Sequence, residues 1–183
     1  MIRALAVFTA SRTGDDPALA EAAYAVGRGL AERHIDLVYG GGGSGLMGAV
    51  SQGAIDHGGR VTGVIPRFMA AREWARSTDE RVVVLHVDTM HERKALMAER
   101  ADAFLALPGG LGTLEEIFEV WTWRTLGLHR KPLGFYDVGG FWAPLLEMLD
   151  QVVGAGLMER RTVDELVVAG DLDKALAELD RRR

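Results

Sequence analysis

The sequence has 183 residues, enough for one domain that buries most of its apolar surface. Hydrophobic content of 48% beside 26% charged residues is ordinary for a globular protein, and a net charge of −5 argues against a protein that coats nucleic acid. The chain has no cysteine, which excludes disulfides and thiolate–metal sites, and no apolar run approaches membrane-spanning length. The first residues, MIRALAVFTA, lack a signal-peptide pattern. We expect a cytoplasmic protein with no nucleic-acid or membrane partner.

Short apolar runs alternate with helical patterns along the chain. The runs predict strands, and the amphipathic segments between them predict helices. The expected strands cover residues 2–9, 35–39, 60–65, 82–87, 103–107, 131–136 and 166–168. The expected helices cover residues 17–34, 44–56, 89–100, 113–126, 141–153 and 172–180, whereas residues 67–78 show no clear pattern.

This alternation predicts an α/β fold: a single Rossmann-like, doubly wound domain over residues 1–183, with a mainly parallel sheet flanked by helices. No linker, low-complexity tract or internal repeat interrupts it. In such folds ligands bind beyond the carboxyl ends of the strands, where the strand order reverses. Two glycine clusters follow strands and precede helices, so we expect them on the same rim of the sheet.

The first glycine cluster lies in YGGGGSGLMG, residues 39–48, and contains G-x-G-x-x-G from Gly43 to Gly48. A dinucleotide site would also need an acidic residue at the end of the next strand, which here reads Val-Ile-Pro-Arg, and a Walker loop would need Gly-Lys-Ser/Thr. NAD binding and ATP hydrolysis are therefore excluded. Two alternatives remain: the turn binds a phosphate through its N–H groups, or it serves only tight strand–helix geometry.

The second cluster lies in LPGGLGTLEE, residues 107–116. Pro108 ends a strand, and we expect Thr113 to begin a helix whose positive end favours a phosphate. Thr113 and Glu116 also have the spacing of a capping box, so Glu116 is either a helix cap or a functional carboxylate. Glu115 lies about 100° away around the helix and cannot share the role of Glu116.

The stretch DTMHERK begins another helix at another strand end, with Thr89 and Glu92 offering a second capping box. Arg93 and Lys94 put positive charge in the first turn, against the helix dipole. They are either solvated surface cations or groups that bind a phosphate or orient a carboxylate. His91 starts no zinc motif, because no second histidine follows one turn later, and we expect no metal.

Together, TMHERKALM and LALPGGLGTLEEIFEVWTWRTLGLHRKP resemble the LOG (Lonely Guy) family of cytokinin-activating phosphoribohydrolases. Both family signatures, PGGxGTxxE and an arginine–lysine pair on the preceding helix, are intact, and the resemblance covers essentially the whole chain. It implies an enzyme that cleaves the N-glycosidic bond of an adenine-type nucleoside 5′-monophosphate, giving free base and ribose 5-phosphate. It also implies no cofactor and a homodimer with sites near the interface.

The resemblance makes Arg93 and Glu116 the catalytic pair. The residues that it places in the nucleotide-contacting segments are Lys94, Gly110, Leu111, Gly112, Thr113, Leu114, Glu115 and Thr122, with Glu73 as a further substrate contact. Where the family commonly has Cys-Gly-Ser, this chain has Thr9-Ala10-Ser11, and Ser11 still offers a hydroxyl to the ligand. The candidates for an alkyl pocket are Met90, Met97, Trp121 and Trp123.

We expect Glu116 to stabilise an oxocarbenium-like ribose and to deliver water. Arg93 would orient Glu116 through a bidentate pair or bind the phosphate. The phosphate would lie on the N–H groups of residues 110–113, with the turn of Gly42, Gly43 and Ser44 closing the other side. The main alternative is a non-catalytic nucleotide or phosphate-ligand carrier of similar fold, which binds without turnover.

Overall fold

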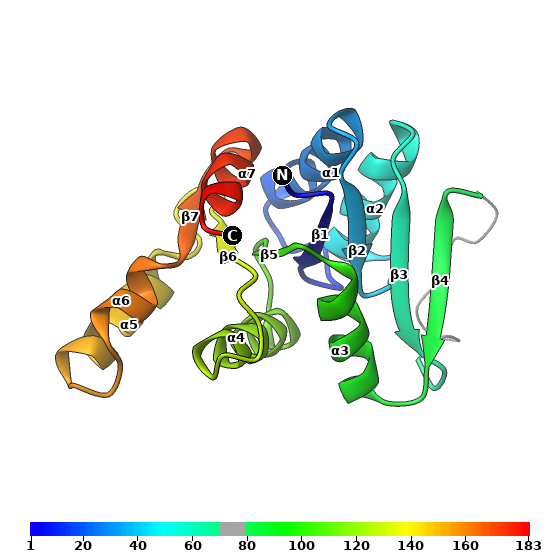
Figure 1. The fold of residues 1–183 in the computed structure, drawn as a ribbon. Helices are drawn as coiled ribbons and strands as arrows, with labels where there is room; N and C mark the ends of the chain where they lie inside the picture. The colour runs from blue at the N-terminus through cyan, green and yellow to red at the C-terminus, as the bar shows by residue number, and fades with distance from the viewer. Residues whose placement is uncertain (70–79) are drawn as a thin grey trace.

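The computed structural model describes residues 1–69 and 80–183. Seven strands form one parallel sheet in the order β4-β3-β2-β1-β5-β6-β7 (Figure 1). The strands are β1 Ala4–Phe8, β2 Asp36–Tyr39, β3 Val61–Pro66, β4 Val82–Val87, β5 Ala103–Ala106, β6 Leu133–Tyr136 and β7 Val167–Ala169. The helices are α1 Pro17–Glu32, α2 Gly45–Asp56, α3 Met90–Arg100, α4 Leu111–Thr125, α5 Ala143–Gly154, α6 Arg160–Asp164 and α7 Leu172–Arg181.

The predicted α/β class is confirmed, and each expected strand and helix is present; β4 has the predicted bounds, and the other elements are shifted by one or two residues at one or both ends. One helix was not predicted: α6 has five residues and no fully buried side chain, too little for a periodic apolar face.

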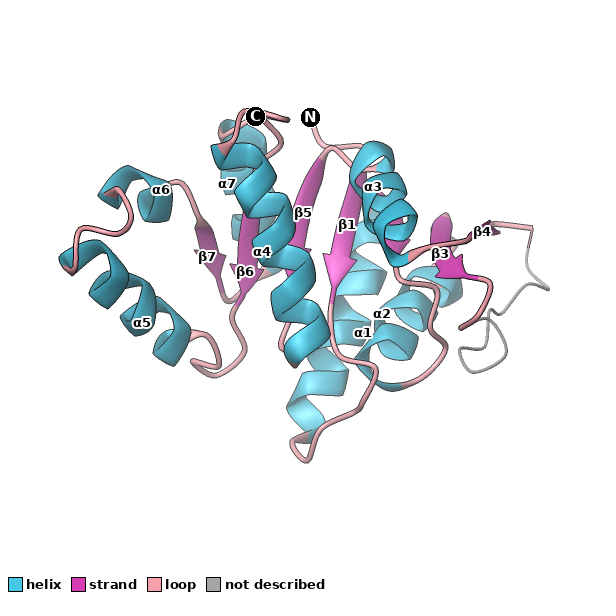
Figure 2. Cartoon of the chain, turned by 90° about the horizontal axis from the view of Figure 1, so that it is seen from below, coloured by secondary structure: helices cyan, strands magenta, loops and turns pink. Residues whose placement is uncertain are grey.

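Helices cover both faces of the sheet. Figure 2 shows α3 and α4 crossing one face, with α1 and α2 behind the other. Two hydrophobic clusters match these layers: α1, α2 and α7 bury Leu30, Val50 and Leu179 against one face. On the other face α3, α4 and α5 bury side chains such as Met97 and Ile117. Strands covered on both sides explain the nearly continuous apolar runs in the sequence.

The strand order reverses at β1. This strand pairs in parallel with β2 on one side and with β5 on the other. The chain therefore builds outward from β1 to β4 and then returns to add β5, β6 and β7 at the opposite side. Just beyond this switch point, the buried hydroxyl of Thr9 donates a 3.0 Å hydrogen bond to the carbonyl oxygen of Pro108, which ties the two diverging loops together.

Close helix packing places the start of α2 against the loop after β1. A Cβ added to Gly27 of α1 would lie 1.9 Å from the carbonyl oxygen of Val50 in α2. Gly45, the first residue of α2, has a φ of +60° and approaches the backbone of Ser11 so closely that a Cβ would lie 2.3 Å from its carbonyl carbon. Glycine is needed at both contacts because any side chain would separate these segments.

Candidate active site

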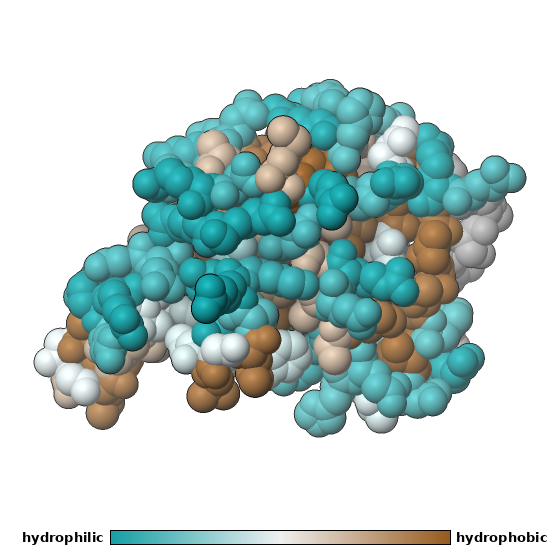
Figure 3. All heavy atoms as spheres, viewed as in Figure 1, coloured by the Kyte–Doolittle hydropathy of each residue, from teal (hydrophilic) through white to brown (hydrophobic). Residues whose placement is uncertain are grey.

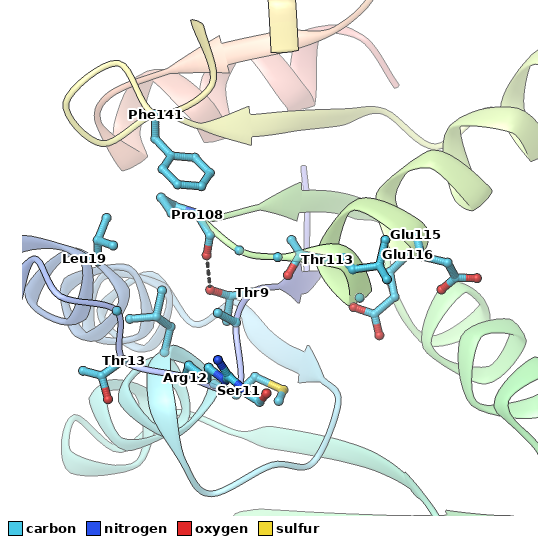
Figure 4. A pocket seen from close by; sticks show the side chains of 18 of the residues that line it. Thr9, Ser11, Arg12, Thr13, Leu19, Pro108, Thr113, Glu115, Glu116 and Phe141 are labelled. Atoms are coloured by element: carbon cyan, nitrogen blue, oxygen red, sulfur yellow. Dashed lines mark hydrogen bonds between the residues drawn. The ribbon is translucent and has the colours of Figure 1, made fainter. Parts of the chain in front are cut away.

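A cavity of about 640 Å³ lies at the switch point, between the loop after β1 and the start of α4 (Figure 4). Eight of the residues expected at the site line it: Ser11, Arg93, Gly110, Leu111, Gly112, Thr113, Glu115 and Glu116. The expected residues absent from this lining are Gly42, Gly43, Ser44, Lys94, Leu114 and Thr122. Glu73 lies outside the described residues. The cavity thus brings together residues from both signature segments.

The N-terminus of α4 opens into this cavity without a side-chain cap. Gly110 is its N-cap residue, and the amide of Leu114 already donates to the carbonyl oxygen of Gly110 at 3.0 Å. The predicted capping box of Thr113 and Glu116 is therefore wrong, since the helix begins two residues earlier than expected. Thr113 is instead buried within the first turn, beneath Gly109. N–H groups that no side chain caps remain at the helix end that an anion prefers.

The N-terminus of α2 differs, because the protein's own backbone occupies it. The amides of Leu46 and Met47 donate to the carbonyl oxygens of Arg12 and Ala10 at 3.3 and 3.1 Å. These contacts are part of tight strand–helix geometry after the first glycine cluster, and phosphate binding by the N–H groups of residues 42–44 stays a prediction. The wall of the cavity expected from residues 42–44 is built by the loop after β1 instead.

Arg93 is a buried cation, not a solvated one. Its side chain inserts between the ends of two strands, where Nε donates to the carbonyl oxygen of Val64 at 3.1 Å and Nη2 donates to that of Gly40 at 2.8 Å. Nη1 lies 3.9 Å from the sulfur of Met90. Among the described residues Arg93 does not form the bidentate pair with Glu116. The guanidinium therefore brings a positive charge to the cavity without a protein carboxylate at hydrogen-bond distance in the described ranges.

The predicted capping box at the start of α3 is confirmed. The Thr89 hydroxyl accepts from the amide of Glu92 at 3.1 Å, and the Glu92 carboxylate accepts from the amide of Thr89 at 3.3 Å. This box fixes the first turn of α3, which carries the adjacent Arg93 and Lys94.

Lys94 links α3 to α4 behind the cavity wall. The buried ammonium forms ion pairs with Glu115 and with Glu119, the latter at 2.9 Å. Burial alone would lower the pKa of Lys94, but hydrogen bonds and charges from both carboxylates outweigh burial and raise this pKa. Sequence reasoning missed Glu119, although its spacing of four from Glu115 places both on one helix face. Lys94 therefore stays charged and holds Glu115 in place.

The remaining expected contacts divide between core and surface. The exposed Thr122 donates its hydroxyl to the carbonyl oxygen of Phe118, one turn back in its own helix, at 2.7 Å. Met97 and Trp121 are buried in the core, and Trp123 packs against it, so only Met90 of the four alkyl-pocket candidates lines the cavity. Sequence reasoning missed other lining residues, among them Arg12, Thr13, Leu19, Met47, Met69 and Phe141.

Within residues 1–69 and 80–183, no group of histidine, cysteine or carboxylate side chains could hold a metal ion. No helix in these ranges is long and apolar enough to cross a membrane.

Comparison with known proteins decides the family. A family model described as "Possible lysine decarboxylase" matches residues 47–179. The cytokinin riboside 5′-monophosphate phosphoribohydrolase LOG7 of Arabidopsis thaliana is 49% identical over 180 residues, which cover 96% of this chain and 82% of that protein. The cytokinin riboside 5′-monophosphate phosphoribohydrolase LOG of Oryza sativa subsp. japonica is 50% identical over 157 residues, which cover 85% of this chain and 64% of that protein. The chain belongs to the LOG family.

The LOG-family fold also occurs in proteins named for binding. The molybdenum cofactor binding protein of Rippkaea orientalis has a TM-score of 0.69 at 20% identity, covering 99% of this chain and 96% of that one. At this identity the likeness concerns the fold alone.

The decarboxylase description of the family model finds no support in the lysines of this LOG-family chain. The chain has three lysines. Lys94 is held between two carboxylates, Lys131 donates to the carbonyl oxygen of Ala98 at 2.6 Å, and Lys174 is exposed on α7. None of them lines the cavity, where a Schiff-base lysine would have to lie.

Proposed function

We propose that this LOG-family protein hydrolyses the N-glycosidic bond of an adenine-type nucleoside 5′-monophosphate and releases the free base and ribose 5-phosphate. The proposal depends on how α4 begins. An open, uncapped helix end and the carboxylate of Glu116, one turn further on, line the same cavity as the buried guanidinium of Arg93.

The glycines of this helix end support a phosphate site. A Cβ added to Gly110 or Gly112 would meet no heavy atom within 4 Å, and neither residue has a positive φ. Glycine inside a helix costs up to about 1 kcal/mol relative to alanine. Glycine is favourable at the N-cap position of Gly110, but the protein's own packing does not require glycine at position 112, inside the helix. A phosphate that must approach the N–H groups of residues 110–113 accounts for it.

The position of Glu116 in the cavity supports a role at the sugar of such a nucleotide. Four residues beyond Gly112 correspond to about 6 Å along the helix axis, comparable to the span of a ribose between its 5′-phosphate and its anomeric carbon. A carboxylate at that position stabilises the positive charge that develops on the ribose as the base departs, and it directs a water molecule to the anomeric carbon. Arg93 supplies positive charge that favours the ionised carboxyl or binds a phosphate oxygen.

The arrangement makes the phosphate part of the catalytic apparatus. Its binding energy fixes the reacting carbon against Glu116, so an adenine nucleoside without phosphate is a poor substrate. The experiment is incubation with AMP, with isopentenyladenosine monophosphate and with adenosine, followed by chromatography of the bases. Release of base from the nucleotides supports the proposal. Tight nucleotide binding without any base release would identify a carrier instead.

Three methionines in the cavity lining support adaptable recognition of the base. Met47, Met69 and Met90 line the cavity, and methionine side chains adjust to irregular groups. This lining supports acceptance of an alkyl group on the adenine amine. Higher kcat/KM for isopentenyladenosine monophosphate than for AMP would support a cytokinin nucleotide hydrolase. Equal or higher kcat/KM for AMP would favour a general AMP nucleosidase.

We also propose that the protein forms a homodimer. Figure 3 shows apolar surface along the lower edge of the molecule, over the end of α4 and the turn between α5 and α6. Leu126, Leu128 and Leu157 are 69%, 70% and 80% exposed. Leu126 and Leu128 follow directly after the last residue of α4, Thr125, whereas Trp121 within the helix is buried. Analytical ultracentrifugation of the wild type and of Leu128→Glu tests this association. The location in the cytoplasm stays a prediction.

A further inference from the structure

Arg12 lies on the wall of the cavity opposite the start of α4, in the loop between β1 and α1 (Figure 4). It belongs to neither glycine cluster and to neither family signature. Its neighbours Ser11 and Thr13 line the same wall. The loop therefore faces the helix end that we assign to the phosphate, across the space that the phosphate would fill.

Two hydrogen bonds fix the backbone of this loop. The carbonyl oxygen of Arg12 accepts from the amide of Leu46 at 3.3 Å, and that of Ser11 accepts from the hydroxyl of Ser44 at 3.3 Å. These bonds attach the loop to the start of α2, leaving its side chains to line the cavity. Arg12 thus reaches the ligand from a fixed base, which reduces the entropic cost of binding.

Within the described ranges, the carboxylates that line the cavity do not pair with Arg12. In residues 1–69 and 80–183, Arg12 forms no ion pair with a carboxylate. The two lining carboxylates, Glu115 and Glu116, lie on α4 at the other end of the view in Figure 4. Glu115 is already paired with Lys94. Among the described residues that line the cavity, Arg12 therefore brings positive charge to the end away from the carboxylates.

Arg12 is exposed to solvent, so its contact with an anion depends on the shape of the guanidinium and not on a low local dielectric. Leu19 and Phe141 line the same end of the cavity, away from Glu115 and Glu116 (Figure 4). The fork of the guanidinium also matches two phosphate oxygens.

We infer that Arg12 binds the phosphate oxygens that the N–H groups of α4 do not reach, and that it sets the preference for nucleotide over nucleoside. The inference rests on the proposed function, because it assigns a second side to the same phosphate site. The α4 amides contact the phosphate from one wall and Arg12 contacts it from the other.

The kinetic test compares Arg12→Gln and Arg12→Lys with the wild type. Arg28→Gln is the matched control, since Arg28 is an exposed arginine of α1 outside the cavity. Loss of a hydrogen bond to a charged group predicts a KM for AMP about tenfold higher in Arg12→Gln, with kcat changed less than about twofold. The KM for adenosine should not move, because adenosine has no phosphate. The KM of Arg12→Lys for AMP should lie between those of the wild type and Arg12→Gln, because lysine keeps the charge but lacks the forked guanidinium.

A binding measurement separates this inference from the proposed activity. Calorimetry with ribose 5-phosphate needs no turnover, and Arg12→Gln should weaken its binding about tenfold, whereas Arg28→Gln should not. If the wild type bound ribose 5-phosphate but released no base, the proposed function would fail while Arg12 was still tested. Unchanged AMP KM and ribose 5-phosphate affinity in Arg12→Gln, or an equal rise in KM for adenosine, would overturn the inference. Absence of ribose 5-phosphate binding by the wild type would overturn the inference, whereas base release from the nucleotides decides the proposed function separately.

Discussion

Nη2 of Arg93 on α3 donates a 2.8 Å hydrogen bond to the carbonyl oxygen of Gly40, at the end of β2. The approach is so close that a Cβ on Gly40 would lie 2.0 Å from this nitrogen. A glycine that does not line the cavity therefore fixes the position of the buried cation that does.

Substitution of this glycine should reduce activity from outside the cavity. In Gly40→Ala the new methyl group displaces the Arg93 guanidinium, so we expect base release to fall at least about tenfold and the free energy of unfolding to drop by about 1–3 kcal/mol. Steady-state kinetics and urea denaturation measure the two effects. Gly154→Ala is the control, because a Cβ there meets nothing within 4 Å and residue 154 ends α5 away from the cavity. Wild-type turnover in Gly40→Ala would mean that the position of Arg93 is unimportant.

Gly112→Ala should move stability and binding in opposite directions. Alanine improves the helix by up to about 1 kcal/mol and meets no protein atom within 4 Å. Its methyl group occupies space at the N–H groups that the phosphate needs, so the KM for AMP should rise. Thermal denaturation and steady-state kinetics on one preparation test the expected rise in stability and the expected rise in KM. Higher stability with an unchanged KM would mean that the phosphate binds elsewhere.

Removal of the Lys94 charge should destabilise the protein. Lys94→Gln leaves Glu115 and Glu119 side by side without their cation, at a cost of about 3 kcal/mol. The double variant Lys94→Gln/Glu119→Gln should recover part of this loss, which urea denaturation can measure. Because the pKa of Lys94 is raised, its contribution is present below 10.5 and is lost only as the pH rises through the higher folded value. A cost that stays the same in the double variant would contradict the pairing.

Asp102 should contribute stability that acid removes. Its carboxylate accepts hydrogen bonds from the amides of Arg3 and Ala4 at 2.8 and 3.2 Å, which joins the start of β1 to β5. Burial alone would raise the pKa of Asp102, but these bonds outweigh it and lower the pKa below 3.8. The contribution is therefore present above 3.8 and is lost as the pH falls through the lower folded value.

Asp102→Asn should cost about 1 kcal/mol at neutral pH. Urea denaturation of both proteins from pH 7 down to pH 3 should show the difference shrinking at the acid end. A difference independent of pH would show that the charge on Asp102 is not what stabilises these contacts.

Local patterns in the sequence predicted the sheet and its rim well. Continuous apolar runs identified the buried strands, and the capping box of Thr89 and Glu92 marked the start of α3 correctly. The same pattern failed at Thr113, because glycine is an acceptable N-cap residue and the helix could begin at Leu111. The S/T-x-x-E spacing alone cannot indicate whether an earlier residue already caps the helix.

Features that depend on distant segments could not be predicted. Arg12 lines the cavity because the loops after the paired strands β1 and β5 diverge at the switch point, and that neighbourhood joins residues about a hundred positions apart. Arg93 is identified as a buried residue only when the ends of β2 and β3 are known to surround it. Met97 and Trp121 have the apolar character of pocket residues, but their helix faces turn them into the core.

We propose that Glu116 acts on the sugar while the helix end before it holds the phosphate. The direct measurement is base release from AMP and isopentenyladenosine monophosphate by Glu116→Gln, beside calorimetric binding of the same nucleotides. Glu147→Gln, on the exposed face of α5, is the matched control. We expect the nucleotide affinity of Glu116→Gln to stay within about threefold of the wild-type affinity. Its kcat should fall at least about a hundredfold, consistent with the size of general acid–base contributions. Near-normal kcat in Glu116→Gln would contradict it.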